Sequence, residues 1–228
     1  MAAASFHGYV IGHARRVWRD LAMARSPVTL LTCGVLVVVF AVQLLEAMRL
    51  GTTVQSLTGY LFYARPRFAW PLAFFLHRDA AHVGGNLLLI AFLGRLAEPN
   101  FSTRSYAAFF VGVAITSVSG GFLAIALFDR GPVVAYGASG LGFALAGYSL
   151  QYLRGIDRPV LRGGATSSLS SAEWLAVIVG LAAVFTVALD VGTGPFFDAY
   201  WLNGAHAVGL VVGLLVGWYA PPSRHPSV

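Results

Sequence analysis

The sequence predicts an all-α membrane protein, a bundle of six transmembrane helices, from three observations. The chain has 228 residues, of which 57% are hydrophobic and only 11% are charged. A soluble domain carries roughly 25% charged residues, so this chain lacks the polar surface of a soluble enzyme, a disordered chain or a nucleic-acid binder. The mean hydropathy is +0.73, and because a spanning helix needs about 20 mostly apolar residues, several spans fit.

Apolar stretches follow one another along the chain and are separated by segments rich in proline, glycine, serine and charge. Inside a bilayer every backbone polar group must be satisfied within its own segment, so each stretch is predicted to be a helix. The spans are expected at about 28–48, 83–97, 106–128, 133–153, 172–190 and 202–220. The breaks between them are expected at Pro66 and Pro71, 98–100, 129–132, 163–171 and 191–200.

Three parts are expected along the chain: a basic segment at 1–27, one membrane domain at 28–220 and a tail at 221–228. The basic segment has no cleavable signal pattern, so the first apolar run is predicted to be an uncleaved anchor. The loop at 49–82 is rich in aromatic residues, which is typical of structure lying at the membrane interface. The single cysteine, Cys33, excludes an intrachain disulfide.

The arginines indicate an orientation. The formal charge is +6, every basic residue apart from histidine is an arginine, and these arginines are scattered through loops rather than clustered, so no nucleic-acid partner is expected. With six spans and a cytoplasmic N-terminus, ten arginines fall inside and five outside. Short cytoplasmic loops are enriched in basic residues, so both termini are predicted to be cytoplasmic, in what we expect to be a bacterial inner membrane.

The second, fourth and sixth spans carry polar residues at corresponding ends. With six spans, these ends lie at one depth near the outer face. Polar side chains inside spans are costly and usually mark function. The sequence therefore predicts one site made by His77, His82, Asn86, Ser139 and His206.

Ser139 lies between small residues near the expected start of the fourth span, with Gly140 directly after it. A helix N-terminus offers free N–H groups to a developing oxyanion. His206 is followed by Gly209 and Gly213, which share its helix face. Such a glycine face lets helices pack backbone to backbone. If it packs on the Ser139 helix, the imidazole comes within reach of the hydroxyl and can act as its general base.

His82 and Asn86 are four residues apart and lie on one helix face. An imidazole and a carboxamide placed in this way can direct donors at one oxygen, as an oxyanion hole requires. His77 is five residues before His82 and is not expected to share that face closely. It is predicted to be a supporting group that anchors the loop.

Together these motifs resemble the rhomboid family of intramembrane serine proteases. The resemblance rests on His77-x4-His82-x3-Asn86, on Gly137-x-Ser139-Gly140 and on Ala205-His206-x2-Gly209-x3-Gly213, in that order. It runs from about residue 50 to 218. It implies that Ser139 is the nucleophile and His206 the base, in a dyad without an acidic member. His82, Asn86 and the Ser139 N–H would form the oxyanion hole, and Phe143 would replace the tyrosine that often packs against the histidine.

The resemblance also implies the partners: transmembrane proteins, single-pass or other, as substrates and the surrounding lipid, with no cofactor and no metal. The segment 190–203 is expected to form a mobile cap over a shallow cavity. One departure is Trp70-Pro71 where the family usually has Trp-Arg, so Arg67 or Arg78 is expected to brace the loop. Glu98 is expected to be an ion-pairing or capping group.

Three other interpretations stay open. An inactive relative would bind membrane helices without cutting them. A metal site or small transporter could be built from His77, His82 and His206, although the spacing of these residues is not that of a metal motif. A glycine-packed scaffold would be indifferent to the loss of Ser139. The substrate, the cleavage position and the oligomeric state are not predicted.

Overall fold

The computed structural model describes residues 25–128, 136–155, 169–197 and 204–219, together with positions 12, 15 and 17. Every regular element among the described residues is helical, which confirms the all-α prediction. The elements, in order, are α2 (Pro27–Arg49), α3 (Val54–Ala64), α4 (Pro66–Leu72), α5 (Ala80–Ala97), η1 (Glu98–Asn100), α6 (Thr103–Phe128), α7 (Ser139–Ser149), η2 (Leu150–Gly155), α9 (Ser171–Phe197) and α10 (Gly204–Tyr219).

Four of these helices are long and apolar enough to cross a membrane, and they contain Pro27–Arg49, Ala80–Asn100, Thr103–Ala124 and Ser171–Asp190. The apolar α10 has 16 residues and α7 has only 11, short of the roughly 20 that a straight crossing needs. The structure therefore describes a multi-pass helical membrane protein, and the count of six spans stays a prediction.

The loop at 49–82 contains the helices α3 and α4. One expectation about the connections was wrong. The break expected at 191–200 does not begin at 191, because α9 continues to Phe197 through Gly192, Gly194 and Pro195. Glycine and proline are tolerated in membrane helices, where neighbouring groups satisfy the freed backbone. Residues 198–203 of the expected cap, and the breaks at 129–132 and at 163–168, lie outside the described residues.

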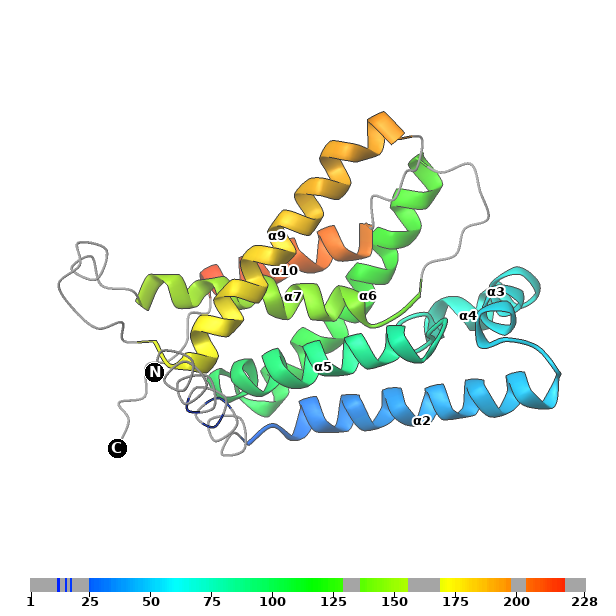
Figure 1. The fold of residues 1–228 in the computed structure, drawn as a ribbon, viewed down its shortest axis with the longest axis horizontal. Helices are drawn as coiled ribbons and strands as arrows, with labels where there is room; N and C mark the ends of the chain where they lie inside the picture. Colours follow the sequence, from blue (N-terminus) through cyan, green and yellow to red (C-terminus); the bar gives the residue numbers. More distant parts are fainter. Residues whose placement is uncertain are drawn as a thin grey trace, which may run out of the picture.

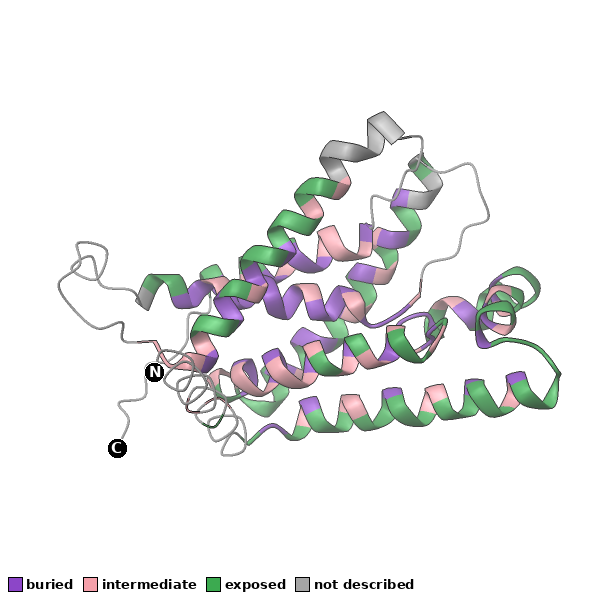
Figure 2. Ribbon diagram, viewed as in Figure 1, coloured by how far each residue is buried: buried purple, intermediate pink, exposed green. Residues whose placement is uncertain are grey.

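The short α7 lies in the middle of the bundle, between α5 and α9 in the view of Figure 1. Nine of its residues, from Gly140 to Ser149, are buried, and Figure 2 shows it almost wholly in the colours of buried and intermediate residues. The helix α2 lies at one edge of the bundle, and the residues along its outer side are exposed (Figure 2). The interior of the protein is therefore built around the helix that begins at Ser139.

Buried polar groups hold α2 at its N-terminal end. The backbone N–H groups of Val28 and Thr29 donate to the two carboxylate oxygens of Glu98, over 2.8 and 2.9 Å. A carboxylate at this position satisfies donors that have no partner inside the helix and complements the helix dipole. The hydroxyl of Thr29 also lies 3.3 Å from that of Tyr106 in α6. The capping role expected for Glu98 is confirmed, and the helix that it caps is α2.

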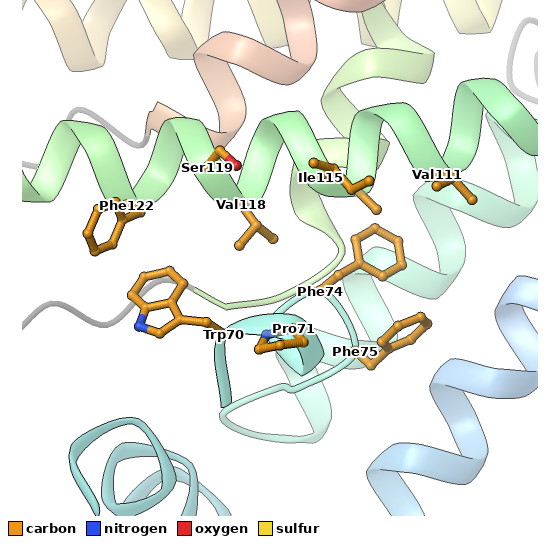
Figure 3. Close-up of a pocket in the computed structure, with 10 residues that line it drawn as sticks. Trp70, Pro71, Phe74, Phe75, Val111, Ile115, Val118, Ser119 and Phe122 are labelled. Atoms are coloured by element: carbon orange, nitrogen blue, oxygen red, sulfur yellow. The ribbon is translucent and has the colours of Figure 1, made fainter. Parts of the chain in front are cut away.

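A groove of about 740 Å³ lies between α6 and the segment from Trp70 to Phe75 (Figure 3). Its lining is apolar and aromatic apart from Ser119. At one end Trp70 meets Phe122 edge to face, with ring centroids 4.9 Å apart, so the loop is braced there by an aromatic contact. Neither Ser139 nor His206 lines this groove, and the shallow cavity expected over the site stays a prediction.

Candidate active site

Ser139 and His206 lie at the starts of two helices that pack against each other. Ser139 is the first residue of α7, and His206 is the third residue of α10. The Nε2 atom of His206 lies 2.8 Å from the Oγ atom of Ser139. Both side chains are half-buried. The arrangement brings a hydroxyl within reach of a base, which is the geometry that nucleophilic catalysis requires.

Glycines on α10 set the distance between these two helices. A Cβ on Gly209 would overlap the carbonyl oxygen of Gly140, and a Cβ on Gly213 would overlap that of Ala144. From the other side, a Cβ on Gly147 would lie 2.5 Å from the carbonyl oxygen of Leu210. The two backbones are thus in direct contact, the close approach that small-residue faces permit. This contact holds His206 against the start of α7.

A stacked aromatic ring fixes the imidazole plane. The rings of Phe143 and His206 are nearly parallel, at 6°, with centroids 4.1 Å apart. Phe143 lies one turn after Ser139 on α7, so its ring supports the imidazole from the helix that carries the hydroxyl. Stacking restricts rotation of the imidazole without contributing a hydrogen bond.

The start of α5 is fixed by Asp79. Its Oδ1 atom accepts the backbone N–H of His82 over 2.7 Å, and its Oδ2 atom accepts from Nε of Arg78 over 3.0 Å. The N–H of His82 holds the pKa of the Asp79 carboxyl below its usual value. This N-cap places His82 in the first turn of α5 and Asn86 one turn later. Arg78, which was expected to brace the loop, forms this exposed ion pair with Asp79.

A glycine turn brings His82 and Asn86 against the chain that leads into α7. Gly137 has a φ of +114°, a conformation that L side chains rarely adopt. A Cβ on Gly137 would lie 2.7 Å from Cε1 of His82 and 3.6 Å from Nδ2 of Asn86. Its N–H donates to the carbonyl of Ala73 over 2.8 Å. Hence the starts of α5 and α7 meet at this turn, and the contact between Ser139 and His206 brings the start of α10 to the same place.

The prediction that His77 would not lie close to the His82 face was wrong. The two rings are 5.0 Å apart, and Nε2 of His77 lies 2.9 Å from Nδ2 of Asn86. The reason is that His77 precedes α5, which begins at Ala80. Helical spacing does not apply to His77, and the loop folds its ring back onto the helix. His77 is fully buried, and its role as an anchor of the loop stays a prediction.

The hydrogen bonds of His77 identify its tautomer. Its Nδ1 atom lies 3.0 Å from the carbonyl oxygen of Phe75, which can only accept, so Nδ1 carries the proton. The Nε2 atom is then an acceptor for the amide of Asn86, and for the N–H of Ala138 at 3.4 Å. Burial, with a further contribution from His82, lowers the pKa of His77 to about 4, so the ring is neutral at pH 7.

Gln43 was not predicted from the sequence to belong to the site. This side chain of α2 is buried and makes two hydrogen bonds to the backbone of His77: Nε2 donates to the carbonyl, and Oε1 accepts from the N–H, both over 3.1 Å. Its Nε2 atom also donates to Oγ1 of Thr58 in α3 over 2.9 Å. A glutamine within an apolar span is the signal that could have found it.

Among the described residues, no group of three or more His, Cys, Asp or Glu side chains could hold a metal ion. The Nδ1 atom of His82 is buried without a hydrogen-bond partner there. The structure thus places the hydroxyl of Ser139 beside the imidazole of His206. The imidazole of His82 and the carboxamide of Asn86 lie close to the turn at Gly137.

A family model described as the Rhomboid domain matches residues 67–223, which is more than half of the chain. No curated protein matches the sequence. The matched range contains α5, α6, α7, α9 and α10, and therefore every residue of the candidate site except Gln43 and Thr58. The chain belongs to the rhomboid family.

Proposed function

We propose that this protein is an intramembrane serine protease that cuts transmembrane proteins in or near their spanning segments. The observation that carries the proposal is the 2.8 Å contact between Nε2 of His206 and Oγ of Ser139, inside a helical protein of the rhomboid family. A serine hydroxyl is a weak nucleophile until an adjacent base takes its proton, and His206 is placed to do so.

In the proposed reaction, Oγ of Ser139 attacks the carbonyl carbon of the scissile bond while its proton moves to Nε2 of His206. The C–N bond then breaks, and His206 gives the proton to the leaving amine. Water next attacks the resulting ester, loses a proton to His206 and releases the new carboxyl end. The proton finally returns to Ser139, so the enzyme is regenerated.

Asn86 and His82 are the proposed donors to the tetrahedral oxyanion, together with the backbone N–H of Ser139 at the start of α7. The support for Asn86 is its hydrogen-bond inventory: a carboxamide nitrogen has two hydrogens, and one is directed at His77. The second can be directed at the oxyanion. Losing one such donor typically costs about 10²–10³ in kcat.

The proposed substrates enter from the membrane, because the site lies among apolar helices. A scissile carbonyl inside a helix is already hydrogen-bonded, so the substrate must unwind locally before Ser139 can attack. The excess of arginine in the segments expected inside the cell supports an orientation with both termini in the cytoplasm. The cleavage site would then lie toward the outer face, in what we infer is a bacterial cell membrane.

The test is cleavage of a fluorogenic spanning-segment substrate by the full-length protein in liposomes, with Ser139→Ala and His206→Ala beside the wild type. Both variants are expected to lose all measurable cleavage, because each removes one partner of the proton transfer. The matched control is Ser149→Ala. Ser149 is a buried serine on the same helix that donates to the carbonyl of Leu145, and its loss is expected to leave cleavage intact.

A parallel series contains EDTA, which is expected to change nothing; a loss of activity with EDTA would favour the metal site instead. Equal turnover by the wild type and Ser139→Ala would contradict the proposal. If the folded wild type cuts none of several substrates but binds spanning peptides, the inactive helix-binding relative is the better account. The presence of both Ser139 and His206 in contact favours the protease.

A further inference from the structure

We propose that Gln43 positions the oxyanion hole by fixing His77, which in turn orients the carboxamide of Asn86. The inference rests on the proposed protease function. It concerns a helix outside the family match, because α2 ends at Arg49 and the match begins at residue 67. The first span would then contribute to the reaction without touching the substrate.

Both polar atoms of the Gln43 side chain have hydrogen-bond partners. Its carbonyl oxygen accepts the N–H of His77, and its two amide hydrogens go to the carbonyl of His77 and to the hydroxyl of Thr58. That hydroxyl gives its own hydrogen to the carbonyl of Val54 over 2.8 Å. Each donor and acceptor of the Gln43 amide therefore has a partner. Exchanging its oxygen and nitrogen would break these hydrogen bonds, so the amide has only one orientation.

His77 connects Gln43 to the site. The two hydrogen bonds hold the carbonyl and the N–H of His77, so they fix the backbone position from which its side chain extends. That ring is fully buried and presents Nε2 to the amide of Asn86 over 2.9 Å. With one hydrogen of the Asn86 amide held in this way, the direction of the other is set. A displaced His77 would release the amide to rotate away from the oxyanion.

Attachment of α2 to the bundle does not by itself explain the hydrogen bonds of Gln43. If α2 needed only attachment to the bundle, Glu98 and Thr29 at its other end already provide it. Gln43, Thr58 and His77 have at most 5% of their surface exposed. Burying these polar groups is costly unless each is satisfied. Two of the three hydrogen bonds of Gln43 go to the backbone of His77, whose ring contacts the amide of Asn86.

The test compares Gln43→Met and Thr58→Val with Thr29→Val, using the full-length protein and the fluorogenic substrate. Thr58 and Thr29 are both fully buried threonines, but only Thr58 contacts Gln43. Gln43→Met is expected to lower kcat by about 10- to 100-fold, since small misplacements at a reacting centre have effects of this size, with KM unchanged. Thr58→Val should act in the same direction but less. Thr29→Val should lower the melting temperature and leave kcat unchanged.

The deciding measurement repeats Gln43→Met in an Asn86→Ala background. If Gln43 acts through Asn86, the double variant is no slower than Asn86→Ala alone, because interacting residues are not additive. Independent, multiplicative losses would overturn the inference, as would an unchanged kcat in folded Gln43→Met. If Gln43→Met does not fold, Thr58→Val decides by the same criteria.

Failure of this inference is distinguishable from failure of the proposed function. A wild type that cuts while Ser139→Ala does not, together with a Gln43→Met as fast as the wild type, rejects only the role of Gln43. A wild type no faster than Ser139→Ala rejects the protease, and the positioning role is then rejected with it.

Discussion

The helices α10 and α2 are joined to the rest of the bundle in different ways. On one side, α10 meets α7 backbone to backbone, with glycines where any side chain would overlap a carbonyl. On the other side, α2 is held by side chains at its two ends, Glu98 and Thr29 near one and Gln43 near the other. Much of the surface between these attachments is exposed (Figure 2).

The two kinds of contact differ in how far a helix can shift before the contact is lost. The bonds that hold α2 run mainly from one side chain to backbone groups, so the axis of α2 can shift slightly while the side chain adjusts and the bond is kept. Two backbones in contact have no such freedom, since packed interiors respond to the addition of even one carbon. The proposed proton transfer requires a fixed distance between Ser139 and His206, and the rigid kind of contact is found there.

Among the variants that test this difference between the contacts, Gly209→Ala has the largest expected effect. The added Cβ would overlap the carbonyl oxygen of Gly140, so α10 must move away from α7 and carry His206 from Ser139. We expect cleavage to fall by about 100-fold or more, measured as kcat/KM with the fluorogenic substrate in liposomes.

Gly34→Ala is the matched control for this variant. Gly34 lies in α2, and a Cβ added there meets nothing within 4 Å. This second glycine-to-alanine change is expected to leave cleavage unchanged. Equal activity of Gly209→Ala and Gly34→Ala would contradict the view that backbone contact sets the distance in the proposed dyad.

A smaller effect, on stability rather than turnover, is expected for Glu98→Gln. The substitution replaces an acceptor of one α2 N–H by a donor, so one buried N–H group loses its partner. The cost should be about 1–3 kcal/mol of unfolding free energy, seen as a lower melting temperature in detergent. The kcat of the folded protein should not change, because Glu98 is not among the groups that contact the proposed dyad.

Glu46→Gln tests whether the charge alone matters. Glu46 pairs with Arg49 on the exposed surface of the same helix, and exposed pairs contribute little. We expect no measurable change in melting temperature. A large fall in kcat for Glu98→Gln, at a temperature where it is folded, would show that α2 is coupled to the site through both of its ends.

The same contrast explains which parts of the structure the sequence could predict. Glycines at fixed spacing from His206 are visible as a pattern, so the approach of α10 to the start of α7 was expected. His77 was misjudged because helical spacing was applied to a residue before the Asp79 cap. A glutamine within an apolar span marks Gln43 as unusual, but its partner at the site is the backbone of His77, and no pattern of residue types in the sequence records a backbone partner. Gly137 takes its positive φ from the turn, which periodicity does not reveal.

The smallest expected effect is that of Phe143, which separates two ways of holding the imidazole. If glycine contact alone orients His206, then Phe143→Leu should cut as fast as the wild type. If the stacked ring contributes, the loss should match the 0.5–1.5 kcal/mol of an aromatic pair, or about 2- to 10-fold in kcat. Phe143→Tyr keeps the ring and should stay near the wild type. We expect the second result, because contact at Gly209 sets the position of the helix and not the rotation of the imidazole, which the parallel ring at 4.1 Å restricts.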